Sequence, residues 1–96
     1  MSQPRVVLLT RADCSLCDEA AVVVAGVCED AGTAWRTVDV DSDGRLRAAY
    51  TDHVPVVFAD RELHGYWFVD AEKLKQALTG SPARPMADDW HPLGTT

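Results

Sequence analysis

The residues most able to do chemistry are two cysteines near the start of the chain, Cys14 and Cys17, separated by Ser15 and Leu16. They follow an apolar run over residues 6–9 and open a segment with helical periodicity. A Cys-x-x-Cys pair at a strand-to-helix turn is typical of redox motifs when a βαβ pattern surrounds it. The spacing therefore predicts an attacking thiol and a resolving thiol one helical turn apart, within disulfide reach.

Cys14 is expected at the helix N-terminus, where free backbone N–H groups and the helix dipole favour negative charge. That position stabilises a thiolate, which is the form of cysteine that attacks disulfides. Asp13 directly precedes Cys14, and its negative charge opposes the thiolate, so we assign it a tuning role. His53 could also approach the pair and tune Cys14 electrostatically. The simpler interpretation of His53, which we favour, is an exposed loop histidine.

The composition bounds the class of protein. The chain has 96 residues, enough for one domain with a single core. It carries 15 Asp and Glu against 9 Lys and Arg, and this acidic balance argues against nucleic acid and anionic membranes as partners. Its apolar runs are too short for a membrane span or a signal peptide. Three cysteines in such a chain favour redox chemistry in the cytoplasm, and we expect a monomer.

The rest of the chain predicts the elements that position the cysteines. Strands are expected over residues 5–10, 33–40, 54–59 and 63–68, and helices over residues 15–31 and 71–78. A short helix is also expected after the turn at residues 41–44, through Leu46, Ala48, Ala49 and Tyr50. Asp60-Arg61 is expected to form a tight hairpin turn, and Asp70 to cap the last helix. The resulting order βαβαββα predicts an α/β fold with a four-stranded mixed sheet flanked by three helices.

The C-terminal residues differ in composition from what precedes them. We divide the chain into a domain over residues 1–80 and a Pro-rich tail over residues 81–96. The residues that prevent a long helix there are Pro82, Pro85, Pro92 and Gly94. Trp90 stands out in this tail. A lone aromatic residue in such a segment more often packs back on its domain than binds a partner, so we expect packing.

Other candidate sites are weaker. Cys28 lies on the Cys17 face of the predicted helix but about 16 Å away along its axis, so we expect a buried structural cysteine. The pattern Asp39-x-Asp41-x-Asp43-Gly44 matches the first half of an EF-hand loop, but Tyr50 stands where a bidentate Glu is required. Calcium is therefore not expected.

A metal bound by the Cys-x-x-Cys pair would need two more ligands. The candidates are His53, His64 and His91. A second Cys-x-x-Cys or a His-x₃-His would support such a site, and the chain has neither. We therefore expect no metal and no organic cofactor.

Four features together resemble the glutaredoxin-like branch of the thioredoxin fold: the early Cys-x-x-Cys, the strand Val54-Pro55-Val56-Val57-Phe58, the following Gly65 and the final amphipathic helix. More narrowly, residues 14–20 and 38–41 are similar to a family of small bacterial glutaredoxin-like proteins. The resemblance covers residues 5 to about 79 and leaves the tail unaccounted for. It implies a thioredoxin-like βαβαββα fold.

The resemblance also implies roles for residues that contact substrate. Pro55 would be a cis-proline facing the cysteine pair, and Val54 would offer its backbone N–H and C=O to an extended substrate. Arg11 falls where glutaredoxins usually carry a Lys that binds the glutathione carboxylate, and Arg can make that contact bidentately. Leu16 and the Val54-Pro55 segment would shape the groove. Tyr66, Trp67 and Phe68 are expected as core and edge-strand aromatics, although one could line this groove.

These features predict a dithiol thiol–disulfide oxidoreductase in which Cys14 attacks and Cys17 resolves. Its partners would be disulfide-bearing proteins or small-thiol disulfides, with a small thiol such as glutathione or mycothiol as a co-substrate. The alternative is a thioredoxin-fold binding or redox-sensing module without turnover, in which the aromatic segment or the tail docks a protein.

Overall fold

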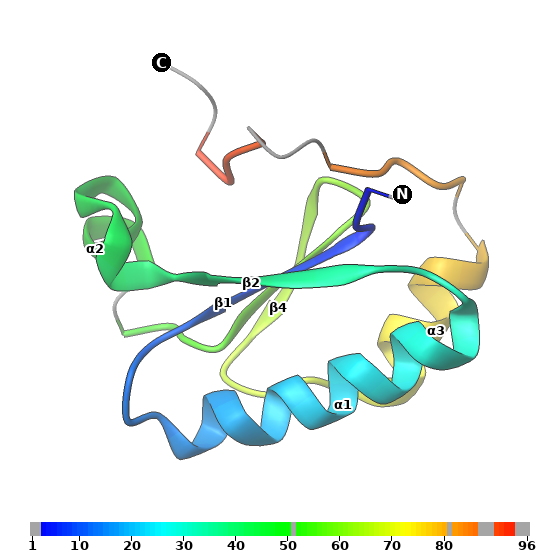
Figure 1. Cartoon of the computed structure of the whole chain (residues 1–96), viewed down its shortest axis with the longest axis horizontal. Helices are drawn as coiled ribbons and strands as arrows, with labels where there is room; N and C mark the ends of the chain where they lie inside the picture. The colour runs from blue at the N-terminus through cyan, green and yellow to red at the C-terminus, as the bar shows by residue number, and fades with distance from the viewer. Residues whose placement is uncertain (1–2, 51, 81, 87–89, 94–96) are drawn as a thin grey trace.

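The computed structural model describes residues 3–50, 52–80, 82–86 and 90–93. Within them the chain forms β1 (Val6–Thr10), α1 (Ser15–Ala31), β2 (Trp35–Asp39), a 3₁₀ turn (Val40–Ser42), α2 (Gly44–Tyr50), β3 (Val56–Ala59), β4 (Glu62–Tyr66) and α3 (Ala71–Gly80). The predicted order βαβαββα is confirmed (Figure 1). No helix in the described ranges is long and apolar enough to cross a membrane.

The four strands form one mixed sheet in the order β2-β1-β3-β4. β1 runs parallel to β2 and antiparallel to β3, and β4 returns antiparallel to β3. Residues 6–9 of the central strand are all 0% exposed, because the sheet is covered on both faces. This burial is the reason for the unbroken apolar run in the sequence.

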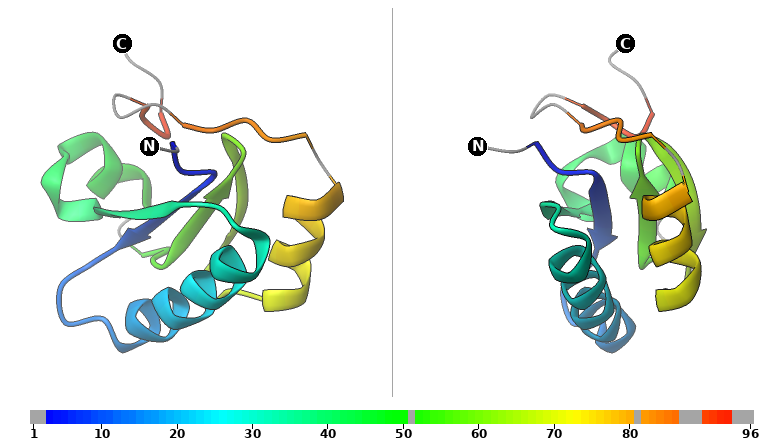
Figure 2. Two further views of the ribbon diagram at one scale, coloured as in Figure 1. Left: turned by 45° about the vertical axis from the view of Figure 1, so that its right-hand side comes forward. Right: turned by 90° about the vertical axis from the view of Figure 1, so that its right-hand side faces the viewer.

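Helices α1 and α3 lie together on one face of the sheet (Figures 1 and 2). The side chains that α1 buries there are Cys17, Ala20, Val24, Val27 and Cys28. α3 adds Leu74 and Leu78 to the same core cluster. Gly32 ends α1 in the left-handed conformation (φ 67°), and its N–H donates to the carbonyl of Glu29 while the N–H of Thr33 donates to that of Cys28. This C-terminal motif favours the glycine that the sequence places there.

The opposite face is covered by α2 and by the last part of the chain, which we call the C-terminal strap (residues 82–86 and 90–93; Figure 2). Met86 is 0% exposed, and its N–H donates to the Pro4 carbonyl at 2.8 Å. Trp90 packs edge-on against Phe58 with ring centroids 5.5 Å apart. The prediction that Trp90 packs back on the domain is confirmed, and the segment expected to be only a tail completes a core cluster.

The hairpin between β3 and β4 turns at Asp60 and Arg61, whose φ angles of 50° and 72° confirm the predicted tight turn. Asp60 is buried and accepts hydrogen bonds from the Arg5 guanidinium at 2.7 and 2.8 Å and from the Arg84 N–H at 2.9 Å. Burial opposes ionisation of this carboxyl, but the bonds from Arg5 and Arg84 outweigh it and hold the Asp60 pKa below its ordinary value. The turn thus ties the strap to the sheet.

The prediction for the fourth strand is wrong at its end, because β4 stops at Tyr66 and not at Phe68. Trp67 has φ 75°, and its N–H donates to the carbonyls of Pro55 at 2.7 Å and His53 at 3.2 Å. A left-handed residue turns the chain out of the extended conformation. Tyr66, Trp67 and Phe68 are consequently 42%, 50% and 75% exposed. Tyr66 is an edge-strand aromatic, as expected, but the expectation that these residues also belong to the core is wrong.

Candidate functional site

The two cysteines lie where β1 passes into α1. Cys14 is the N-cap residue of α1, with extended backbone angles, and its sulfur accepts a hydrogen bond from the Cys17 N–H at 3.2 Å. The two sulfurs are joined in a disulfide, with Cα atoms 5.2 Å apart. A sulfur at this position receives both a backbone N–H and the positive end of the helix dipole, which would stabilise the Cys14 thiolate after reduction.

The two cysteines differ in exposure. Cys14 is partly exposed, whereas Cys17 is only 2% exposed and belongs to the buried face of α1. A substrate disulfide can therefore reach Cys14, while Cys17 is shielded by the helix and the sheet. This asymmetry fits an attacking residue followed by a resolving residue.

Val54-Pro55 enters β3 at the same end of the sheet. Leu9 near the end of β1 pairs with Val56 at the start of β3, so the loop that carries Cys14 and the Val54-Pro55 segment leave the sheet side by side. The Val54–Pro55 peptide bond is cis, as the resemblance implied. Within the described part of the chain, no hydrogen bond engages the backbone of Val54. Its N–H and C=O are thus available to pair with an extended ligand.

Arg11 and Asp13 lie in the loop before Cys14. The Arg11 Nε donates to Asp41 at 3.1 Å, and the same carboxylate also pairs with Arg47 at 3.2 Å. Arg11 is therefore held toward the 3₁₀ turn, and its predicted role in binding a substrate carboxylate stays a prediction. Asp13 is exposed, with φ 57°, and adds a negative charge beside Cys14.

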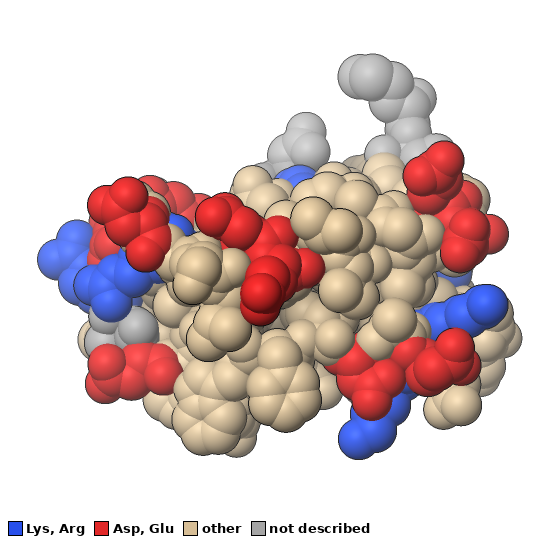
Figure 3. All heavy atoms as spheres, turned by 90° about the horizontal axis from the view of Figure 1, so that it is seen from below, with Lys and Arg blue, Asp and Glu red and all other residues tan. Residues whose placement is uncertain are grey.

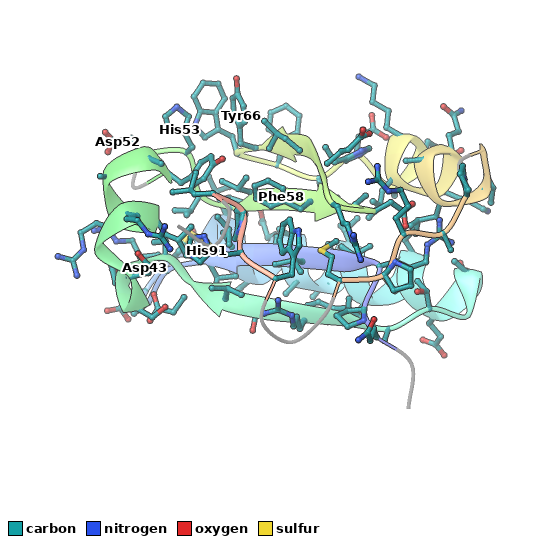
Figure 4. The ribbon with its side chains drawn as sticks, turned by 90° about the horizontal axis from the view of Figure 1, so that it is seen from above. Asp43, Asp52, His53, Phe58, Tyr66 and His91 are labelled. Atoms are coloured by element: carbon teal, nitrogen blue, oxygen red, sulfur yellow. A yellow bond between two sulfur atoms is a disulfide. The ribbon has the colours of Figure 1, made fainter. Side chains whose placement is uncertain are left out.

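His53 is not the exposed loop histidine that we favoured. It is partly buried, and its ring stacks on Trp67 with centroids 6.1 Å apart and 5° between the planes. Tyr50 and Tyr66 meet it edge-on at 6.5 and 5.3 Å. Figure 4 shows His53 beside Tyr66 at one corner of the molecule. The cause is Trp67, which turns back over the 52–55 loop and donates its indole N–H to the Asp52 carbonyl at 3.0 Å.

Leu16, between the cysteines, is 50% exposed and forms one wall of a shallow groove of about 160 Å³. The residues that line this Leu16 groove are Leu16, Glu19, Ala20, Val23, Phe68 and Val69. The groove thus runs between the first turns of α1 and the segment that leads into α3. The sequence analysis allows one of the three aromatics at residues 66–68 to line a groove beside Leu16, and Phe68 is the one that does. The turn at Trp67 that directs Phe68 here is not predicted by any sequence pattern.

A larger cavity, of about 240 Å³, lies far from the cysteines. Its lining includes Asp60, His64 and Arg84. Ala59 pairs with Val6 at the opposite end of β1 from Cys14, so this cavity is at the other end of the sheet. Burial lowers the pKa of His64. None of the described residues that line the cavity is a Cys, Ser or Thr, and we do not connect it with the cysteine chemistry.

Cys28 is 1% exposed near the end of α1, and burial raises the pKa of its thiol to about 11. It would be almost entirely a neutral thiol at pH 7, so the expectation of a structural cysteine is confirmed. In the described ranges, no group of three or more His, Cys, Asp or Glu side chains is arranged to hold a metal ion.

A mixed sheet in the order β2-β1-β3-β4, a Cys-x-x-Cys at the start of α1 and a cis-proline before β3 define a glutaredoxin-like protein of the thioredoxin fold. Residues 5–79 match the model of the glutaredoxin-like domain family (DUF836), and the chain belongs to that family. The C-terminal strap lies outside the matched range.

Relatives and solved structures agree with this assignment. The chain is 41% identical over 86 residues to uncharacterized proteins of Mycobacterium tuberculosis and Mycobacterium bovis, covering 84% of this chain and 89% of theirs. A Xanthomonas campestris protein solved by X-ray crystallography is similar with TM-score 0.66 and 32% identity, covering 80% and 99% of the two chains. A buckwheat glutaredoxin solved with glutathione shares the fold, with TM-score 0.51 and 20% identity over 79% and 77% of the chains.

Proposed function

We propose that this protein is a dithiol thiol–disulfide oxidoreductase. The observation that carries the proposal is the asymmetric cysteine pair: Cys14 is accessible at a helix N-cap, and Cys17 is buried within bonding distance of it. The glutaredoxin-like family and the cis-proline beside the pair support the same chemistry. A cytoplasm, where small thiols keep such pairs reduced, would suit this activity.

The reaction begins with the reduced pair. The Cys14 thiolate attacks one sulfur of a substrate disulfide, the other substrate sulfur leaves as a thiolate, and a Cys14–substrate mixed disulfide forms. The Cys17 thiol then loses its proton to solvent and attacks the Cys14 sulfur, which releases the second substrate thiolate. Two electrons have passed from the cysteine pair to the substrate, and Cys14 and Cys17 end as a disulfide.

The groups around the pair would hold the substrate during this exchange. The free backbone groups of Val54 would pair with the substrate chain beside its disulfide. Disulfide-bearing proteins or small-thiol disulfides are the substrates, and a small thiol such as glutathione or mycothiol would return the Cys14–Cys17 disulfide to its reduced form. Arg11 would meet a thiol carboxylate only by exchanging its contact with Asp41.

A second candidate function is a binding or redox-sensing module without turnover. The exposure of Phe68 in the Leu16 groove, and of Trp67 next to it in the chain, favours it, because large exposed apolar residues often mark protein contacts. In that function the Cys pair would change state without reducing a substrate. Turnover with a disulfide substrate separates the two candidates.

The first test is a redox titration of the purified protein in thiol–disulfide buffers, with alkylation and mass measurement of the free thiols. We expect a reversible Cys14–Cys17 couple between about −270 and −200 mV, the range of cytosolic dithiol reductants. Cys14→Ser is the control, because it removes the couple and leaves Cys17 and Cys28. A pair that is oxidised only by harsh reagents would exclude the proposed activity.

The second test traps the intermediate. Cys17→Ser should accumulate a mixed disulfide on Cys14 when mixed with a substrate disulfide, because the resolving thiol is missing. Cys14→Ser is the matched control and should trap nothing, since Cys17 is buried. Equal trapping by both variants would contradict the assigned roles.

A further inference from the structure

The Leu16 groove is directly linked to the reacting sulfurs. Leu16 is the residue before Cys17 and two residues after Cys14, and it supplies one wall of the groove. Phe68, the most exposed large apolar residue here at 75%, supplies the opposite wall. Ala20, Val23 and Val69 complete an apolar floor. A chain whose disulfide is attacked by Cys14 would place a neighbouring side chain in or beside this groove.

The surroundings of the groove are acidic. Glu19 lines the groove, and Asp70 lines the neighbouring pocket that shares Phe68 with it. Asp13 and Asp18 are exposed carboxylates next to Cys14 and Cys17 in the sequence. Of the nearest cations, Arg11 is bonded to Asp41, and Lys73 lies with Asp70 on the other side of Phe68. Figure 3 shows this helical face, where acidic side chains lie among uncharged ones near the middle and basic side chains appear toward both ends. A cation on a bound ligand would therefore be favoured here, and an anion disfavoured.

The start of α3 is closed to an anionic ligand. Asp70 accepts a hydrogen bond from the Lys73 N–H at 3.1 Å, so a carboxylate of this chain already caps the helix. A ligand carboxylate at that helix end would meet the Asp70 charge instead of free N–H groups. Small thiols that carry carboxylates thus gain nothing at this end of the groove.

We propose that the Leu16 groove selects polypeptide disulfides whose reacting cysteine is flanked by an aliphatic residue and by a Lys or Arg. The aliphatic side chain packs between Leu16 and Phe68, and the cation meets Glu19, the carboxylate that lines the groove. This inference rests on the proposed function and names its substrate class. It makes the groove a specificity site distinct from the backbone contact at Val54.

The test uses tripeptides, blocked at both ends, whose central cysteine is joined in a mixed disulfide to 2-nitro-5-thiobenzoate. The reduced protein attacks the peptide sulfur, and the coloured thiobenzoate leaves as a thiolate that is followed by absorbance. The peptides are Leu-Cys-Lys, Leu-Cys-Glu and Gly-Cys-Lys, together with the same residues in reverse order. 2-Hydroxyethyl disulfide serves as an uncharged substrate with no side chains.

We expect the Leu-Cys-Lys peptide to react about tenfold faster than Leu-Cys-Glu at low salt, with the ratio falling toward about two in 0.5 M salt as exposed charges are screened. We expect it to react about fivefold faster than Gly-Cys-Lys, with little dependence on salt, because a half-buried aliphatic contact is apolar. Ratios between peptides cancel any change in the intrinsic reactivity of Cys14.

Matched variants locate the two preferences. Phe68→Ala should abolish the Leu preference and Glu19→Gln should weaken the Lys preference. Leu63→Ala, an equally exposed leucine on β4, and Glu29→Gln, at the far end of α1, are the controls and should change neither ratio. Equal rates for all peptides, with rapid reduction of 2-hydroxyethyl disulfide, would overturn the proposed selectivity of the groove and would leave the proposed oxidoreductase activity standing. No reaction with any disulfide would overturn the proposed function, and the groove inference with it.

Discussion

The two faces of the sheet are covered in different ways. Two helices, α1 and α3, lie side by side on one face and bury a repeating set of small and branched apolar residues. The other face is covered by the short α2 and by the C-terminal strap, which has no regular structure and buries a few large side chains (Figures 2 and 4). Together the two arrangements leave residues 6–9 of the central strand β1 at 0% exposure.

The two faces differ in role: one carries the reactive cysteines, and the other holds the end of the chain against the sheet. The helical face carries the cysteines, the Leu16 groove and the exposed Phe68, so it presents the surface on which a substrate would dock. The strap face is held by individual contacts, among them the Met86 N–H to the Pro4 carbonyl and the Arg61 guanidinium to the Pro85 carbonyl at 2.9 and 3.1 Å. If the strap is part of the fold, these contacts should stabilise the folded protein as much as the contacts of a helix do.

The prediction with the largest expected effect concerns whether the strap contributes as much to stability as the helices do. Met86 and Leu74 are each 0% exposed, one under the strap and the other in α3. Met86→Ala and Leu74→Ala should each lower the free energy of unfolding by about 3 kcal/mol, because each leaves a cavity in a closed core. Urea unfolding measures both. Leu93→Ala, at a residue 39% exposed, is the control and should cost less than about 0.5 kcal/mol.

The same variants show whether the two faces unfold together. Cys28 lies on the helical face and is 1% exposed, and the same burial raises its pKa to about 11, so the folded protein should protect it from alkylation. In a background of Cys14→Ser and Cys17→Ser, Met86→Ala should speed Cys28 labelling by about 100-fold if the core opens as one unit. Labelling unchanged from the parent would mean that the strap opens alone, and the faces would then be independent.

The helical face was predicted well from the sequence, and the strap face was not. Apolar periodicity and Gly32 gave the limits of α1, and the continuous apolar run identified β1 as a strand buried on both sides. The proline-rich segment after residue 80 shows neither the apolar periodicity of a helix nor the apolar run of a buried strand. Its burial depends on single contacts such as Met86 to Pro4, which join residues far apart in the chain and leave no local pattern. Only Trp90 indicated that this segment packs on the domain.

The candidate site, like the fold, was predicted only in part. The spacing of Cys14 and Cys17 and the resemblance to a known fold were enough to place the pair and the cis-proline. The surroundings of His53 and Phe68 were missed because they follow from one left-handed residue, Trp67. Sequence patterns favour glycine or asparagine in that conformation, so a tryptophan gave no warning.

A smaller effect is expected from the ion pair that ties the strap to the sheet. Asp60→Asn should lower the free energy of unfolding at pH 7 by about 2 kcal/mol, since the partly buried ion pair between Asp60 and Arg5 loses its negative charge. The pKa of Asp60 is lower in the folded protein than its ordinary value. Its stabilising effect is therefore complete above that ordinary value, near 4, and is lost as the pH falls through the folded value.

Urea unfolding of the parent and of Asp60→Asn at pH 7, 5, 4 and 3 measures this dependence. The difference between them should be constant down to about pH 5 and shrink below about pH 4. Glu62→Gln, an exposed carboxylate on the same hairpin, is the control and should change the stability little at any pH. A difference between parent and Asp60→Asn that does not vary with pH would show that packing, and not the charge, is what Asp60 contributes.

The smallest effect concerns the far end of the strap, where the His91 Nε2 lies 2.8 Å from the Asp43 carboxylate beside α2 (Figure 4). The pKa of Asp43 is lowered first by the Arg45 N–H and then by His91. His91→Ala should therefore raise the Asp43 pKa only part of the way to its ordinary value, because the backbone bond stays. Carboxyl-carbon NMR across an acid titration measures the shift. Arg45→Ala is the control. It removes the charged side chain but keeps the backbone N–H that bonds to Asp43, so most of the lowering of the Asp43 pKa should remain. If the Asp43 pKa is the same with and without His91, then His91 does not bond to Asp43 in solution, and Trp90 is the last residue of the strap that contacts the domain.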